Sequence, residues 1–504
     1  MKVRNKKALA LLLGLLLAVG SLAGCGNNET EKPENENNEA YSETKNENEG
    51  TDEVVEITWH RTAWHTNEDE QAVEDAINAI IEPKIGVRIK TLNDAANAPL
   101  DTMIAGGDDV DLCWVASWSN LYNFIDNGAA YDITDVIQNY PDLYASMPES
   151  IWDAAQTDGR NMYIPIYKES ANATGLSVPT NIVEKYDWDL STIKTLADIE
   201  PMLEEAYADG MEYPFAVQQS FFDSWGIDTF AFLDKYAGVR RDDPTKVVNI
   251  METDEYKAHV ELMYKWNQAG YINQAETDEE AISDQIIADL RAEGNNAFYR
   301  WAMIPDSNAA ATTRYGMDTQ VVQLTKTYME TDSPAGSAYM INAKSDEATV
   351  DACLKFVQLL FTDNEVANLA CFGIEGKHYN LNDEGKVELI PDSGYAYPGV
   401  YIVTNVQAPT LLAGEADNKL ELYNEFNNSA EISCTAGFRF DKTNVAAECT
   451  ALDGVLAEYR PLLERGFYNP EEYLPQFQEA LKTAGIDKVI SEMQTQLDEF
   501  NASK

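Results

Sequence analysis

Residues 54–59 read VVEITW, and with the 60 residues that follow they decide the fold. Val55, Ile57 and Trp59 alternate with polar residues, as in a half-buried strand. The chain then alternates strands with amphipathic helices, with helices over 72–81 and 99–104 and strands over 87–92 and 111–115. This order predicts an α/β fold with a parallel sheet and helices on its faces.

Two clusters of aromatic and polar residues follow strands of this predicted sheet. Trp59, His60 and Trp64 lie at and after the end of the first strand, and Ser117 and Trp118 follow the third. Ligands of open α/β sheets bind beyond the carboxyl ends of the strands. We therefore expect these residues to lie near a ligand site.

The start of the chain has the pattern of an export signal. A basic head precedes the small and apolar run 8–23, and residues 22–25 read LAGC. A core of this length is typical of a secretory signal rather than of a membrane-spanning helix. The last four residues resemble a bacterial lipobox, which implies cleavage before Cys25 and a lipid on its sulfur that anchors the protein to a membrane. The alternative is an ordinary secretory signal with an incidental cysteine.

Composition limits the partners. Residues 26–53 are rich in Asn and Glu and predict a disordered acidic tether. The whole chain has 36 Lys and Arg against 86 Asp and Glu, a formal net charge of −50, which argues against nucleic acid as a partner.

The cysteines and histidines show no spacing typical of a metal site, and we expect no metal or cofactor. If Cys25 is lipidated, five of the six cysteines remain, so at least one has no disulfide partner. A bond between Cys434 and Cys449 is left open, because spacing does not give geometry.

The rest of the chain alternates strands and helices less regularly. Residues 162–168 read as a strand that crosses to a second lobe, and 180–320 are mostly helical by pattern. Strands are expected at 297–303 and 335–342. A stripe of apolar residues at helical spacing over 486–500 predicts a helix packed on the core.

Several short motifs occur in a fixed order along the mature chain. They are IAGG (104–107), DL (111–112), ASW (116–118), DG (158–159), YIP (163–165), KTLAD (194–198), TDNEV (362–366), GIEGKHY (373–379), GFRFD (437–441), NPE (469–471) and IDK (486–488). Together they resemble the extracellular solute-binding proteins of ABC importers, the sugar-binding family 1. Within it they are most similar to LipO-like lipoproteins with an added C-terminal domain. Arg439 departs from that pattern, since the family often has a small residue there.

The resemblance implies two α/β lobes, of the type II periplasmic-binding kind, that close around a ligand by a hinge. The first lobe is expected over 54–165 and 333–392. The second is expected over 166–332 and 393–504, including the C-terminal domain. A carbohydrate is the implied ligand, and ABC permease subunits are the implied partner. The chain is expected to be a monomer on the outer face of the cell membrane and not an enzyme. It has no Walker A motif, so ATP hydrolysis falls to other subunits.

A sugar site needs flat rings for stacking and polar groups for hydrogen bonds. The candidate residues are aromatic or polar side chains near strand ends, loops or the crossing segments: Trp59, His60, Trp64, Ser117, Trp118, Tyr167, Lys168, Glu169, Trp225, Trp301, His378, Tyr379 and Asn380. Each has a structural alternative. Trp59 and Trp301 fit a sheet core, His378 fits a turn, and Lys168 with Glu169 fits a surface ion pair.

The sequence leaves three other functions open. The first is binding of a different solute, such as a peptide or a polyol. The second is a surface glycoside hydrolase with paired carboxylates, and the third is an adhesive lipoprotein without a cleft. Turnover of substrate separates the hydrolase from a binding protein, and compaction on ligand binding separates the adhesin.

Overall fold

The computed structural model describes residues 54–61, 67–93, 99–157, 159–217, 222–272 and 284–503. The predicted signal, Cys25, the tether and Trp64 lie outside these ranges. Of the described helices, none has the length and apolar character needed to span a membrane.

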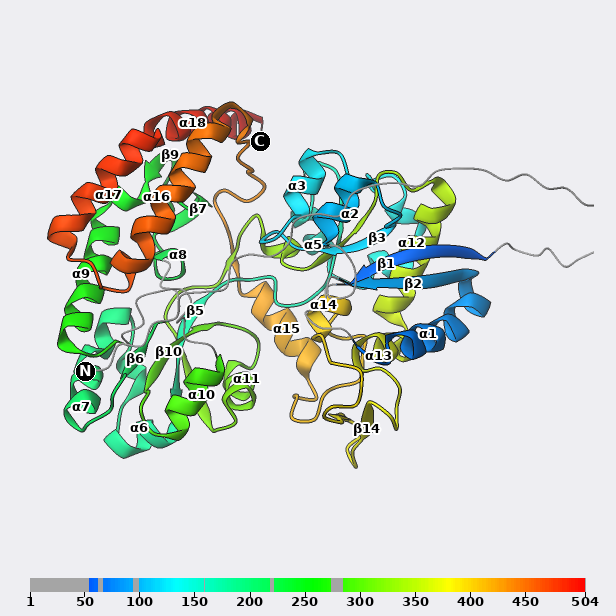
Figure 1. The fold of residues 1–504 in the computed structure, drawn as a ribbon, viewed down its shortest axis with the longest axis horizontal. Helices are drawn as coiled ribbons and strands as arrows, with labels where there is room; N and C mark the ends of the chain where they lie inside the picture. The colour runs from blue at the N-terminus through cyan, green and yellow to red at the C-terminus, as the bar shows by residue number, and fades with distance from the viewer. Residues whose placement is uncertain are drawn as a thin grey trace, which may run out of the picture. The chain divides into compact units, whose positions relative to one another are not determined.

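The first lobe is built on a five-stranded sheet of order β2-β1-β3-β13-β4 (Figure 1). Its strands are β2 (Val87–Asn93), β1 (Val55–Arg61), β3 (Leu112–Val115), β13 (Ala338–Ile341) and β4 (Ile164–Pro165). The strand β1 runs parallel to β2 and β3, and β13 is antiparallel to β3 and β4. The predicted α/β class and the parallel start of the sheet are therefore confirmed.

Helices cover both faces of this sheet and carry clear end signals. They include α1 (Glu70–Ile85), α2 (Leu100–Gly106), α3 (Leu121–Asp126), α12 (Glu347–Thr362) and α13 (Asn364–Phe372). Asp363 accepts hydrogen bonds from the first backbone N–H groups of α13, and Gly86 ends α1 with a φ of 66°. The short helices α4 (Pro141–Tyr144) and α5 (Glu149–Ala154) and the hairpin of β14 (Tyr379–Leu381) and β15 (Val387–Leu389) complete this half.

The second lobe has a four-stranded sheet of order β11-β5-β10-β6. The strands are β11 (Thr319–Gln323), β5 (Thr174–Pro179), β10 (Phe298–Ala302) and β6 (Phe215–Ala216). Its helices are α6 (Thr180–Tyr186), α7 (Glu200–Ala208), α8 (Phe222–Trp225), α9 (Asp254–Ala269), α10 (Asp284–Ala292) and α11 (Ser307–Tyr315).

A second small sheet corrects the expectation that 180–320 is mostly helical. The strands β7 (Phe230–Asp234), β8 (Ala237–Arg240) and β9 (Asp243–Asn249) form an antiparallel meander. Its apolar side chains share one core with α16 (Ala446–Glu464), α17 (Pro470–Ala484) and α18 (Ile486–Ser503). The C-terminal helices thus bury these strands from about 200 residues away, which a local pattern does not reveal. The stripe of α18 is buried, as expected, at Ile486, Val489, Met493 and Leu497.

Three segments connect the lobes and bond to one another. Asn172 and Tyr328 exchange two backbone hydrogen bonds of 2.8 and 2.9 Å. The strand β12 (Tyr328–Met329) in turn pairs in parallel with β16 (Glu431–Ile432). These paired crossing strands, which we call the hinge, join the two lobes side by side.

The third crossing lies later in the chain than the expected boundary at 392. The core of the first lobe includes Tyr395, Val406 and three residues of the short helix α14 (Val400–Val403), namely Val400, Ile402 and Val403. The chain leaves that lobe only after α15 (Lys419–Asn428), at β16. Residues 393–428 have no regular apolar period, so only their burial shows which lobe they belong to.

Candidate ligand-binding site

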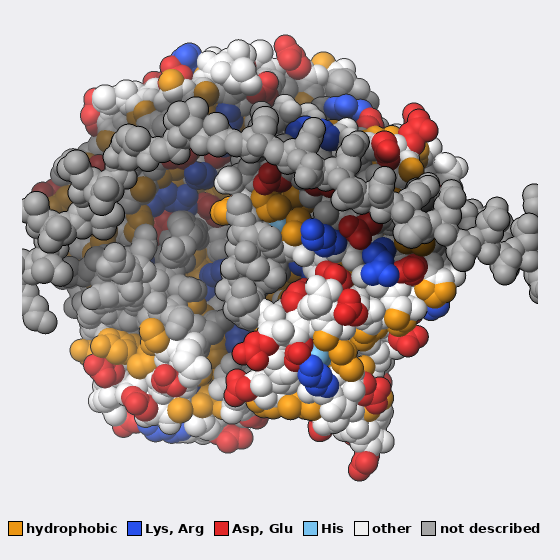
Figure 2. Space-filling view, turned by 45° about the vertical axis from the view of Figure 1, so that its right-hand side comes forward, with side chains coloured by type: hydrophobic (Ala, Val, Ile, Leu, Met, Phe, Trp, Pro, Cys, Tyr) orange, Lys and Arg blue, Asp and Glu red, His pale blue; other side chains and the backbone are white. Residues whose placement is uncertain are grey.

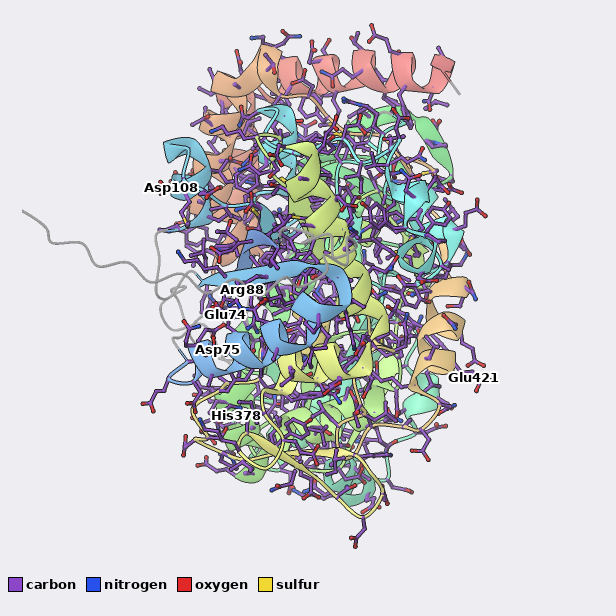
Figure 3. All side chains as sticks on the ribbon, turned by 90° about the vertical axis from the view of Figure 1, so that its right-hand side faces the viewer. Glu74, Asp75, Arg88, Asp108, His378 and Glu421 are labelled. Atoms are coloured by element: carbon purple, nitrogen blue, oxygen red, sulfur yellow. The ribbon has the colours of Figure 1, made fainter. Side chains whose placement is uncertain are left out.

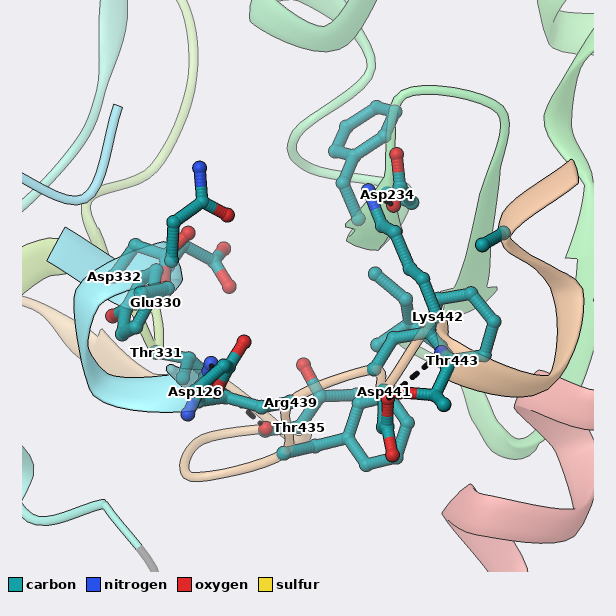
Figure 4. A pocket seen from close by; sticks show the side chains of 17 residues that line it. Asp126, Asp234, Glu330, Thr331, Asp332, Thr435, Arg439, Asp441, Lys442 and Thr443 are labelled. Carbon is teal, nitrogen blue, oxygen red and sulfur yellow. Dashed lines mark hydrogen bonds and ion pairs between the residues drawn. The ribbon is translucent and has the colours of Figure 1, made fainter. Parts of the chain in front are cut away.

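A pocket of about 480 Å³ lies beside the hinge, where α3, β7, the crossing segment at 330–332 and the C-terminal region meet (Figure 4). Its walls thus come from both lobes and from the C-terminal helical region. The lining residues are Tyr122, Asn123, Asp126, Phe232, Leu233, Asp234, Glu330, Thr331, Asp332, Thr435, Phe438, Arg439, Phe440, Asp441, Lys442, Thr443 and Ala446.

Charged pairs organise the pocket. Arg439 Nη2 lies 3.0 Å from Asp126 Oδ1, and Lys442 Nζ lies 2.7 Å from Asp234 Oδ2. Burial is the largest single influence on the pKa of Lys442 and lowers it, but Asp234, Cys449 and Asp453 together raise it, and the net shift is upward. Acidic side chains also spread over the described part of the molecular face in Figure 2. Within the pocket, the two cations Arg439 and Lys442 face a larger number of carboxylates, namely Asp126, Asp234, Glu330, Asp332 and Asp441.

Asp332 lies on the crossing segment 330–332, directly after β12 of the hinge, and its side chain lines this pocket. Tyr122 donates a hydrogen bond to it, and Ser117 Oγ donates to the Asp332 backbone oxygen at 3.3 Å. The Asp332 side chain is exposed to the solvent in the pocket. The pocket walls still surround the carboxyl group with protein atoms, and the loss of solvation raises its pKa. Among the described residues no cation forms an ion pair with it. Asp332 is thus an acceptor available to a ligand.

An exposed tryptophan stands next to this hinge segment. Trp118 is 69% exposed, and its Nε1–H donates to the Gly336 oxygen at 2.9 Å. Its ring lies 5.7 Å from that of Trp114, which is itself tied to Ser337 through Nε1 at 2.7 Å. A large ring held in place but open to solvent is suited to stacking on a flat apolar face.

Two more predicted residues join the same neighbourhood. Lys168 and Glu169 form an ion pair of 2.7 Å on the first crossing segment. A side-chain carbon added at Gly336 would lie 3.6 Å from Lys168 Nζ, so this pair and Trp118 both border Gly336. The structure thus brings together Ser117, Trp118, Lys168 and Glu169.

Four predicted aromatic ligands lie instead in the hydrophobic core. Trp59 has no exposed surface and packs against Phe356, and Trp301 is 1% exposed beneath Arg314. Tyr167 and Tyr379 are buried as well. A ring without exposed surface has no face for a sugar in this conformation, and the positions of Trp59 and Trp301 match the sheet-core alternative.

The remaining predicted residues are spread over the molecule. His60 is buried in β1, Trp225 is half-buried against the core of the second lobe, and Asn380 is exposed on the hairpin strand β14. None of the three lines the pocket beside the hinge. Trp64 lies outside the described residues.

His378 has a structural role in the first lobe (Figure 3). Its Nδ1 accepts the Ile374 N–H at 2.8 Å, so we assign the proton to Nε2, which lies 3.2 Å from Asp69 Oδ2. Lys377 Nζ also contacts Asp69 at 2.6 Å, and its hydrogen bond is the main reason why the pKa of that carboxyl is lowered. His378 therefore fastens the start of α1 to the loop after α13 instead of facing a ligand.

Most residues of the pocket carry no signal in the sequence. Tyr122, Asp126, Asp234 and Asp332 are common residue types in unremarkable surroundings, and only the fold brings them together. Arg439 was singled out as a departure from the family pattern, and it lines the pocket.

Two other sites considered from the sequence can be described. Cys449 is a free thiol whose Sγ lies 3.1 Å from the Tyr236 hydroxyl, so Cys434 and Cys449 do not form a disulfide. Within the described ranges, no three His, Cys, Asp or Glu side chains are placed to hold a metal ion.

Known proteins resemble this chain over most of its length. A "Carbohydrate ABC transporter substrate-binding protein" of Streptococcus pneumoniae is 24% identical over 449 residues, covering 85% of this chain and 87% of that protein. The crystal structure of the N-glycan transport solute-binding protein NgtS from the same species has a TM-score of 0.76 at 21% identity, with 88% of this chain and 99% of that one covered. An extracellular solute-binding protein from Bifidobacterium longum subsp. infantis has a TM-score of 0.58 at 14% identity, covering 89% and 99%.

A family model described as a domain of unknown function (DUF3502) matches residues 434–502. This range contains α16, α17, all but the last residue of α18, and the segment that lines the pocket from Thr435 to Thr443. The added C-terminal domain indicated by the motifs is thus present. The resemblance of the chain to the extracellular solute-binding proteins of ABC importers is confirmed, and it has their two-lobed α/β fold.

Proposed function

We propose that this chain captures a carbohydrate in the pocket beside the hinge and delivers it to an ABC permease. The observation that carries the proposal is the exposed ring of Trp118 beside a pocket rich in carboxylates, at the junction of two lobes. The sequence relative is named for carbohydrate transport, and NgtS has been solved with Man1GlcNAc and with Man5GlcNAc, at TM-scores of 0.69 and 0.68 to this chain. A short neutral glycan is therefore the first ligand to test.

The residues suit reversible capture. The Trp118 ring offers a face for the C–H side of a sugar, and Asp332 accepts hydrogen bonds from hydroxyl groups. Because the pocket has walls from both lobes, a ligand contacts all of them only when the lobes are together. Ligand binding then favours the closed state by its differential affinity for that state.

The predicted anchor completes the proposal. A lipid on Cys25 would hold the protein at the outer face of the cell membrane, and residues 26–53 would let the folded part reach a permease. We propose a monomer that binds its ligand without chemical change.

The test is calorimetry and thermal unfolding of residues 26–504 with Man1GlcNAc, Man5GlcNAc, other neutral oligosaccharides, polyols and peptides. A ligand at 100 times its Kd adds about 2.7 kcal/mol of stability. Saturable binding of a glycan that is recovered intact supports the proposal. Binding of peptides alone refutes the carbohydrate assignment, and breakdown of the glycan identifies a hydrolase. A folded protein that binds nothing on the panel refutes the proposal for these ligand classes.

A further inference from the structure

The domain matched by the model of unknown function contains two different parts. Its three helices share a core with β7, β8 and β9, through residues such as Leu452, Phe477 and Leu481. Ahead of these helices, the segment from Thr435 to Thr443 lines the pocket. The three helices stabilise the second lobe by covering the sheet of β7, β8 and β9. That packing gives no reason for the segment from Thr435 to Thr443 to line the pocket.

The segment is held firmly on the last helix. Phe438 is buried, with its ring 5.6 Å from that of Phe500 in α18. The Asp441 N–H donates to Gln496 Oε1 at 2.9 Å, and Gln496 Nε2 donates to the Asp441 oxygen at 2.9 Å. Arg439 lies between these two anchored residues, so its backbone is fixed relative to the C-terminal helices.

The side chain of Arg439 reaches the other lobe. Its guanidinium contacts Asp126 at the end of α3 at 3.0 Å and lies 4.3 Å from the centre of the Tyr122 ring (Figure 4). Tyr122 in turn donates a hydrogen bond to Asp332 on the hinge segment. One side chain of the C-terminal domain thus meets the first lobe and, through Tyr122, the candidate ligand acceptor.

This contact is suited to reversible use. The side chains of Arg439 and Asp126 are 26% and 62% exposed, and exposed ion pairs contribute little to stability. The contact of the guanidinium with the half-buried Tyr122 ring adds a further attraction. The contact is therefore strong enough to bias two arrangements of the lobes and weak enough to open.

We infer that the C-terminal domain forms one wall of the ligand pocket and that Arg439 is a positioning residue that latches this wall to α3 in the closed arrangement. The ligand side of this inference rests on the proposed function. The latch itself does not, because it predicts a change in lobe arrangement without any ligand.

The experiment measures the distance between the lobes in residues 26–504. Spin labels are placed at Asp75→Cys in α1 and Glu479→Cys in α17, both exposed, with Cys434→Ser to prevent side reaction. We expect Arg439→Ala and Asp126→Asn each to lower the closed-to-open ratio about two- to fivefold, the range for an exposed pair. Exchange of the charges by Arg439→Asp with Asp126→Arg should restore part of the closed population.

The control is Lys488→Ala, which removes an exposed ion pair of 2.7 Å with Glu448 in the same domain without touching the pocket. It should leave the distance distribution unchanged. For the ligand found in the screen, Arg439→Ala should raise Kd by the factor by which it lowers the closed fraction, because only that fraction is competent to bind.

The outcomes separate the two proposals. If both single substitutions leave the distance distribution as in the unchanged protein, the latch is wrong, whatever the protein binds. If the distribution shifts but the unchanged protein binds no glycan, the latch stands and the carbohydrate function fails. Restoration by the charge exchange shows that loss of the pair, and not misfolding, moved the lobes.

Discussion

Replacement of Trp118 by Ala separates ligand binding from folding in this protein. The ring is 69% exposed, so its removal takes little apolar surface out of the core. It loses one exposed hydrogen bond to the Gly336 oxygen and a tilted ring contact with Trp114. We therefore expect the free energy of unfolding to fall by no more than about 1 kcal/mol.

The effect on binding should be larger. An aromatic anchor at the centre of a binding site typically contributes about 1–3 kcal/mol, so Kd should rise about 5- to 150-fold. Trp118→Phe keeps a smaller ring and should lose less. Calorimetry gives Kd with the glycan found in the screen, and denaturant unfolding of the same samples gives stability.

A matched control is Tyr207→Ala, since Tyr207 is 44% exposed on α7 and does not line the pocket. It should leave Kd unchanged. If Trp118→Ala also leaves Kd unchanged while the protein stays folded, Trp118 is not a platform and the site lies elsewhere. A large loss of stability instead would show that the exposed ring supports the fold, contrary to its surroundings.

Further predictions concern the fold, the charge and the anchor. Burial raises the pKa of Glu464 to about 7, above its value in the unfolded chain. The protonated Glu464 therefore stabilises the fold fully below about pH 4.5, and this contribution, on the order of 3 kcal/mol, is lost as pH rises through 7. Glu464→Gln should remove this loss from the free energy of unfolding measured between about pH 4.5 and 7. Gly373→Ala should destabilise the first lobe by about 2 kcal/mol or more in thermal unfolding, because the φ there is 81° and the new carbon would lie 2.3 Å from His378 Nδ1; an unchanged midpoint would show that the loop adapts. An oligosaccharide of uronic acids should bind more weakly than a neutral one of equal length, with the difference shrinking as salt is added; equal affinities at low salt would contradict a pocket dominated by carboxylates. Cys25→Ser should release the protein from the membrane fraction, and a processed variant that stays bound would rule out the lipid anchor.

Local patterns predicted the parts of the fold in which neighbours in sequence are neighbours in space. The stripe of α18 and the alternation over the first residues of β1 each follow from one face being buried, whereas the end of β1 is buried on both faces. The meander β7 to β9 was missed because its burial depends on helices that follow about 200 residues later.

The candidate site shows the same division. Ser117 and Trp118 were predicted from their place after β3, and they lie beside the pocket, because the end of a parallel strand is set by local order. Trp59 and Trp301 lie inside β1 and β10 instead of beyond a strand end, and the helices packed over these strands bury both rings. Exposure of a ring is a property of what packs against it.

The sequence alone determined the order of strands and helices at the start of the chain, the export signal pattern and the resemblance to solute-binding proteins. These depend on residue order along the chain and on short-range periodicity. Only the tertiary structure decided that Tyr122, Asp332 and Arg439 share one pocket and that residues 393–428 belong to the first lobe. Those facts depend on contacts between residues far apart in the chain, such as Asp126 and Arg439 at a separation of 313 positions, which arise only when both lobes and the C-terminal helices have packed.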